Sequence, residues 1–124
     1  EGSLRATLRH IYGAERNWYE RVQAPGSEAF PRATALTTLS ELHDAAGRLT
    51  EARAAWLGEL TASDLDWSYT YSLSTGATYT SRLDDILLHV CNHGTHQRAQ
   101  AVNLLRHLGA PVPELDWIDW TFAS

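Results

Sequence analysis

The 124-residue sequence predicts an all-α fold, an up-down four-helix bundle with a short β-hairpin inserted between two of its helices. Three segments carry apolar residues at alternating steps of three and four, which is the spacing of one helix face. One intervening segment changes to a period of two, as strands do. The hydrophobic fraction of 44% and the charged fraction of 20% are those of an ordinary globular domain.

The first predicted helix covers residues 3–22, with Ser3 as a suitable N-cap. Its apolar positions lie at helical spacing and are Leu4, Leu8, Ile11, Trp18 and Val22. The cluster Ala24-Pro25-Gly26-Ser27 should end this helix, because proline and glycine break helical structure. Residues 24–37 are therefore expected to form a loop.

The second predicted helix covers residues 38–60. Thr38 is followed three residues later by Glu41, the spacing of a capping box. One long face then carries Leu39, Leu42, Ala46, Leu49, Trp56 and Leu60. A face of this length is typical of a helix in a bundle.

Residues 64–80 are predicted to form the hairpin, with Gly76 supplying a positive φ at its turn. The third predicted helix covers residues 81–109. Ser81 and Asp84 form its expected N-terminal cap, and Gly109 is the expected C-terminal glycine. The aromatic segment at residues 116–122 should fold back onto the bundle.

We expect one domain over residues 1–124 that lacks the first helix of its bundle. Four helices are the common closed arrangement at this helix length, whereas the sequence offers three. The chain also begins Glu1-Gly2-Ser3, without methionine. A partner subunit could equally cover the open face, so a homodimer is expected. Trp18, Trp56 and Trp67 are expected in the core.

Three histidines of the third helix suggest a metal site. His89 and His93 are four residues apart, and His93 and His96 are three apart, so their imidazoles share one helix face. Pairs at this spacing can chelate one metal ion. A further ligand would have to come from His10 or His43, the histidines outside this helix.

Polar and small residues interrupt the apolar stripe of the same helix. Gln97 lies within the stripe, so its amide should be hydrogen-bonded in a polar pocket or lie beside a metal ion. Gly94 would allow another element or a ligand to approach closely. Cys91 is interpreted as a small buried hydrophobe. As the single cysteine, it excludes an intrachain disulfide and fits a reducing compartment.

The third predicted helix resembles the signature of the DinB/YfiT-like proteins. The similar residues are Asn92-His93, then His96-Gln97-Arg98-Ala99-Gln100, then Leu104-Leu105-Arg106-His107-Leu108-Gly109. The family pattern has an Asn-His pair, then His-Arg-Gly-Gln, and then Leu-Arg-x-Leu-Gly. The opening at residues 2–11, Ala14-Glu15 and Trp18 are also similar, so the resemblance extends over essentially the whole chain.

The resemblance implies a four-helix bundle that holds a divalent metal ion, zinc or nickel, through three histidines. The matching positions here are His10, His93 and Gln97. The chain departs from the family at Gln97, where the third histidine belongs, and at Ala99, where glycine is usual. An amide oxygen is a poorer ligand for zinc or nickel than imidazole. The site could bind weakly, change register to His89 or His96, or have lost its metal.

Three functions stay open at this point. The first is a metal-dependent thiol S-transferase acting on a small molecule with a low-molecular-weight thiol, as the resemblance implies. The second is a metal-free scaffold or small-molecule-binding stress protein, and the third is a dimerisation module. A net charge of −5 without a basic stripe argues against nucleic-acid binding, and no apolar run approaches the roughly 18 residues of a membrane span. A cytoplasmic location is expected.

Overall fold

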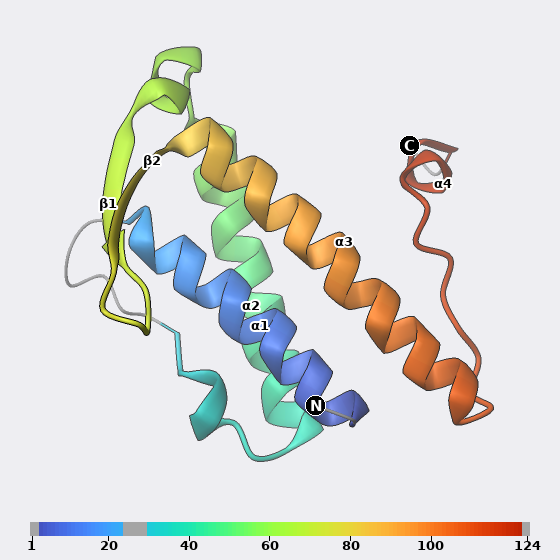
Figure 1. Ribbon diagram of the computed structural model, residues 1–124. Coiled ribbons are helices and arrows are strands. Elements are labelled where there is room, and N and C mark those ends of the chain that lie inside the picture. Colours follow the sequence, from blue (N-terminus) through green and yellow to red (C-terminus); the bar gives the residue numbers. More distant parts are fainter. Residues whose placement is uncertain (1–2, 24–29, 123–124) are drawn as a thin grey trace.

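A computed structural model describes residues 3–23 and 30–122 of the chain, apart from the side chain of Trp120. Three long helices, α1 (Leu4–Arg21), α2 (Leu39–Glu59) and α3 (Leu83–His107), form the body in Figure 1. The shorter elements are η1 (Ala33–Ala35), η2 (Ala62–Asp66), β1 (Ser68–Ser72), β2 (Thr78–Arg82) and α4 (Trp117–Phe122). The predicted helical class with one hairpin is confirmed. The expected breaker cluster at residues 24–27 lies outside the described residues.

Helices α1 and α3 lie side by side and run antiparallel (Figure 1). His10, in the first half of α1, contacts His93 on α3. Trp18, two turns further along α1, contacts His89, which comes one turn before His93 on α3. This order brings the first and last long helices of the chain into direct contact.

Helices α1 and α2 run parallel, which corrects the predicted up-down order for this pair. Tyr12 packs in one cluster with Leu42 near the start of α2. Tyr19, two turns later, contacts Trp56 near the end of α2. The chain between the two helices therefore returns along the bundle before α2 begins, and η1 lies on this return.

Two groups of buried residues hold the three helices together. The first lies between α1 and α2 and consists of Tyr12, Leu36, Leu42, Ala45 and Leu49. The second lies at the hairpin end, where Val22, Leu83 and Ile86 are buried among half-buried residues of α2, η2 and β1. The second group joins all three helices, because Trp56 and Leu60 pack on it.

The predicted caps of α1 and α2 and the end of α3 are confirmed. The Ser3 hydroxyl accepts a hydrogen bond from the Ala6 N–H, and Thr38 and Glu41 form the reciprocal capping box. At the end of α3, Gly109 has a φ of 71°. Its N–H donates to the Arg106 carbonyl, and the Ala110 N–H donates to the Leu105 carbonyl. This pair of bonds is a Schellman motif.

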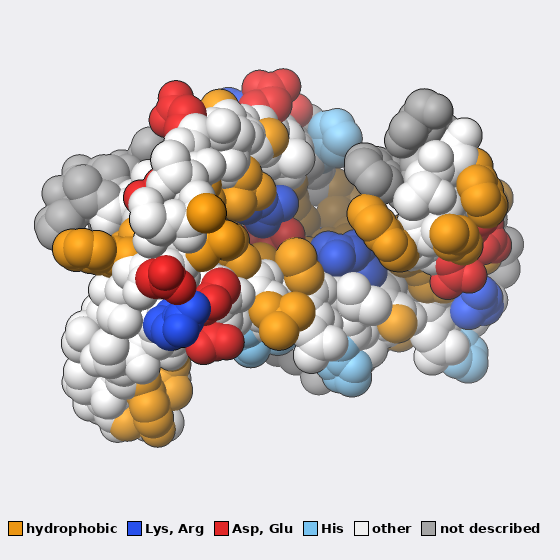
Figure 2. Space-filling view, turned by 90° about the horizontal axis from the view of Figure 1, so that it is seen from above, with side chains coloured by type: hydrophobic (Ala, Val, Ile, Leu, Met, Phe, Trp, Pro, Cys, Tyr) orange, Lys and Arg blue, Asp and Glu red, His pale blue; other side chains and the backbone are white. Residues whose placement is uncertain are grey.

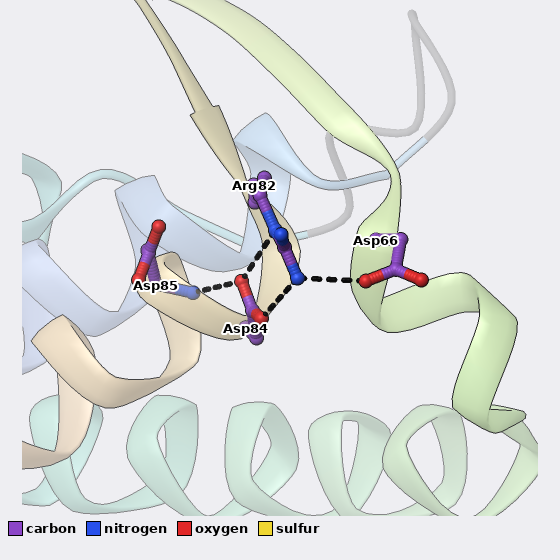
Figure 3. Close-up of polar contacts among 4 residues, drawn as sticks. All are labelled: Asp66, Arg82, Asp84 and Asp85. Carbon is purple, nitrogen blue, oxygen red and sulfur yellow. Dashed lines mark hydrogen bonds and ion pairs between the residues drawn. The ribbon is translucent and has the colours of Figure 1, made fainter.

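The predicted start of α3 at Ser81 is wrong, because β2 continues to Arg82. Arg82 is the N-cap residue and makes no side-chain cap bond. Its guanidinium instead donates to Asp84 and to Asp66 on η2, as Figure 3 shows. The Asp84 carboxylate also accepts from the Asp85 N–H. Two carboxylates in the first turn suit the positive end of the helix dipole.

The hairpin pairs β1 with β2 antiparallel, with Tyr71 opposite Tyr79. Gly76 has a φ of 88°, so the predicted role of this glycine at the turn is confirmed. Trp67, predicted in the core, is 67% exposed. Its carbonyl accepts the N–H of Leu83 at 2.8 Å, which fixes the backbone at the junction while the indole faces outward. Trp18 and Trp56 are half-buried.

Helix α4 lies apart from the long helices at the right of Figure 1. Trp117, Ile118 and Phe122 are 71%, 56% and 74% exposed, so the expectation that this segment is buried on the bundle is wrong. Figure 2 shows hydrophobic side chains on this outlying lobe. Pro111 and Pro113 lie between the end of α3 and α4 and prevent α3 from continuing towards it. No helix within the described residues is long and apolar enough to cross a membrane.

The substitution Gly47→Ala should stabilise the fold by about 0.5–1 kcal/mol, because alanine loses less backbone freedom in a helix than glycine. Gly47 lies within α2, and a Cβ added there meets no atom within 4 Å. Urea denaturation would measure the change. The contrasting variant Gly76→Ala should destabilise the fold, because its φ of 88° disfavours any side chain. Destabilisation by Gly47→Ala would contradict the packing described for α2.

Candidate functional site between α1 and α3

Two imidazoles from distant parts of the sequence meet between α1 and α3. The ring centroids of His10 and His93 are 5.4 Å apart, and the ring planes are inclined by 56°. Two imidazoles bound to one tetrahedral ion at about 2.0 Å have centroids roughly 5 Å apart, so the observed separation suits a shared ion. His10 is exposed and His93 is half-buried, which leaves the pair accessible from solvent.

A third imidazole lies next to this pair. The centroids of His89 and His93 are 5.8 Å apart, and the centroids of His89 and Trp18 are 5.1 Å apart in an edge-to-face arrangement. The predicted shared face of His89 and His93 is therefore confirmed. His96 is exposed, and its ring nitrogen lies 3.3 Å from the Gln100 amide nitrogen.

The surroundings of His93 favour its neutral form. Burial lowers the pKa of this imidazole, and His10, His89 and His96 lower it further, because each would carry the same charge. Glu15 opposes the shift. A metal ion binds the deprotonated nitrogen of a neutral imidazole, so the site keeps His93 in its ligating form.

Gln97 lies one turn after His93 on α3 and is half-buried. It lines an open cavity of about 720 Å³ together with His10. Within the described residues the amide makes no hydrogen bond, so the predicted polar partner for this amide is not found there. The amide is free to contact a ligand or an ion in the cavity.

Gly94 is buried on the same helix, as the predicted stripe requires. A Cβ added there would lie 2.8 Å from the guanidinium nitrogens of Arg98, so this glycine makes room for a side chain one turn further on. Cys91, predicted to be buried, is exposed. It lies on the outer side of α3, away from the face that packs on α1.

The cavity extends along α1 from Ala6 past His10 to Arg21. The Arg21 guanidinium carbon lies 4.4 Å from the centroid of the Trp18 ring and 5.1 Å from that of Tyr71. Sequence reasoning missed this part of the site. The sequence feature that could have predicted it is a spacing of three and four residues, which places His10, Ala14, Trp18 and Arg21 on one face of α1.

A cluster of carboxylates near α4 is a second arrangement that could surround one ion. Within the described part of the chain, one set of three places its ligand atoms within 4.8 Å of one another: Glu114, Asp116 and Asp119. All three are exposed and precede or belong to α4. Exposed carboxylates often lie together without an ion, so this cluster does not compete with the histidine site as a candidate.

Comparison with known proteins identifies the family. The search of curated proteins finds no match. The model of the DinB family matches residues 1–123, almost the entire chain. This match confirms the resemblance carried by the third helix and by the opening of the sequence. The chain therefore belongs to the DinB family.

Proposed function

We propose that this DinB-family protein binds a divalent metal ion between α1 and α3 through His10, His93 and Gln97. We further propose that it uses the ion to transfer a low-molecular-weight thiol to a small electrophile. The observation that carries the proposal is the 5.4 Å separation of the His10 and His93 rings. Zinc and nickel are the ions that imidazole ligands favour.

The residues at the site fit such an ion in two respects. The lowered pKa of His93 supplies a neutral imidazole for ligation at neutral pH. The Gln97 side chain shares a cavity with His10 and has no competing hydrogen bond within the described residues. The fit is weaker at the third position, because amide oxygen is a poorer ligand for zinc or nickel than imidazole.

When bound, an ion of this kind supplies a Lewis acid that lowers the pKa of a thiol or a water. The side chains of the chain then have separate tasks. His10 and His93 hold the ion in place, and the cavity along α1 admits the substrates. In the transfer the sulfur forms a bond to an electrophilic carbon, the leaving group departs with the electron pair, and the thiol proton passes to solvent.

A second function is favoured by Gln97 itself. A chain that has exchanged a histidine ligand for an amide could use the same cavity to bind a small molecule without a metal. The volume of about 720 Å³ lies within the range of small-molecule sites. In this alternative, His10 and His93 would serve as polar groups that contact the ligand.

The test compares metal binding by the wild type with that by Gln97→His. Gln97→His should bind Zn²⁺ or Ni²⁺ about tenfold more tightly or better, because it restores a third imidazole. His93→Ala should abolish binding, and the control His107→Ala, on the exposed end of α3, should leave it unchanged. Isothermal titration of protein stripped with EDTA, with the melting temperature as a second measure, gives the affinities. If neither wild type nor Gln97→His binds either ion, the metal proposal is wrong.

Thiol transfer is tested with the same variants. Metal-loaded wild type should conjugate a thiol to a chromogenic haloarene faster than the stripped protein does. His93→Ala should show no metal-dependent rate. Binding of metal without any metal-dependent conjugation would limit the proposal to metal binding and exclude the transferase.

The metal-free protein should show a His93 pKa below 6.5, measured by NMR titration of the ring C–H signals. Since the folded pKa lies below the unfolded one, the contribution of His93 to stability is present above pH 6.5. It is lost as the pH falls from there through the folded pKa. His10→Ala should raise the His93 pKa towards 6.5, because it removes a like charge, whereas the control His43→Ala on α2 should not. An unchanged His93 pKa in His10→Ala would contradict the described proximity.

A further inference from the structure

Arg21 is a partly buried arginine at the end of α1 that contacts two aromatic rings. Its guanidinium carbon lies 4.4 Å from the centroid of the Trp18 ring and 5.1 Å from that of Tyr71, beside two rings that also contact each other. No carboxylate among the described residues forms an ion pair with it. By contrast, Arg16 pairs with Glu20 and Arg53 pairs with Glu15. The Arg21 guanidinium is thus in contact with two aromatic rings, and its N–H donors have no hydrogen-bond acceptor within the described residues.

Contact with two rings fixes the guanidinium without using its donors. Aromatic faces attract the cation through their quadrupole, an interaction that leaves the N–H groups of a guanidinium available as donors. Burial of the guanidinium lowers the pKa of Arg21, and the neighbouring Tyr71 opposes this shift. A guanidinium whose position is already restricted by two rings loses little side-chain conformational entropy when it binds an anion.

The cavity beside Arg21 has the charge that such an anion requires. Among the described residues that line it are two arginines and three amides, but no aspartate or glutamate. The charged and amide side chains are Arg9, Asn17, Arg21, Gln97 and Gln100. The whole chain has more acidic residues than basic ones, 15 against 10. The described lining of the cavity has the opposite balance, because it contains arginines and no carboxylate. An anionic ligand is favoured here and a cationic one is not.

We propose that Arg21, held against Trp18 and Tyr71, binds a carboxylate of an extended small molecule whose other end reaches His10 beside His93. The planar guanidinium matches a carboxylate through two parallel N–H···O bonds. The placement of the reactive end at the histidines rests on the proposed function, whereas the carboxylate contact stands on Arg21 and its cavity. The assignment makes Arg21 a determinant of substrate class.

The geometry also limits the length of the molecule. His10 and Arg21 are 11 positions apart on α1, which corresponds to about 16 Å between their Cα atoms at 1.5 Å per residue. The Arg21 side chain lies over Trp18, closer to the histidines, which shortens the distance to be spanned. A ligand that joins both ends is therefore about the size of an extended tripeptide. A three-carbon thiol would be too short.

The experiment uses S-methylglutathione, a tripeptide whose sulfur is blocked, and its diethyl ester, in which both carboxylates are neutralised. Binding to the full chain, stripped of metal with EDTA, is followed by isothermal titration. The acid should bind wild type at least tenfold more tightly than the ester. Arg21→Gln should remove this difference, and the matched control Arg5→Gln, an exposed arginine of α1 outside the cavity, should retain it. Equal binding of acid and ester to wild type would overturn the proposal.

A conservative variant keeps the test decisive if Arg21→Gln does not fold. Arg21→Lys keeps the charge but lacks the planar pair of donors, so it should weaken binding of the acid at least threefold while the melting temperature is maintained. Unchanged binding in Arg21→Lys would overturn the proposed paired contact. Because metal is absent throughout, failure here leaves the metal proposal intact. Conversely, carboxylate binding without any metal binding would refute the transferase and retain the Arg21 site.

Discussion

The structure depends on α1 having two faces that pack on different partners. One face buries Tyr12 against α2, and the other places His10 and Trp18 against α3. The first contact is apolar and supplies much of the stability through removal of surface from water. The second contact is polar and aromatic around His10 and His93, whereas at the hairpin end Val22 packs on Leu83 and Ile86 in an apolar cluster. One helix thus takes part in both buried clusters and in the candidate functional site.

Much of the local structure could be predicted from the sequence, because caps and turns depend on few neighbouring residues. Ser3, Thr38, Gly76 and Gly109 all have the predicted roles. The relative direction of α1 and α2 could not be predicted in this way. It depends on the path of residues 22–38, and apolar spacing within two helices says nothing about how the chain between them returns. The parallel arrangement is therefore information that only the tertiary structure contains.

Burial was predicted less well than helical structure. Periodicity placed Cys91 close to the apolar stripe of α3, but the edges of a stripe are decided by which helix covers them, and none covers this one. Trp67 precedes a strand and was predicted in the core because of its residue type. Its carbonyl instead accepts a hydrogen bond from the Leu83 N–H, and its indole is exposed. Aromatic character alone did not decide the position of α4 either, since the segment offers apolar side chains without a complementary surface.

The candidate site contains residues that sequence motifs predicted and residues that only the tertiary packing brings together. The family motif on α3 and the matching position of His10 predicted the two imidazoles, and the structure brings them together. That His10, His93 and Gln97 bind a metal ion stays a prediction. Arg21, Trp18 and Tyr71 meet because a helix end and a strand pack side by side, and no local pattern connects position 71 with the other two. Sequence motifs therefore predicted the histidines, whereas only the tertiary structure showed the position of Arg21.

The contact between His10 and His93 also has a consequence for folding. The two residues are 83 positions apart in the sequence, so closing their contact costs chain entropy. The unfolded chain does not hold the two imidazoles together. A molecule that binds both therefore binds the folded chain in preference, and by mass action it stabilises the fold against unfolding.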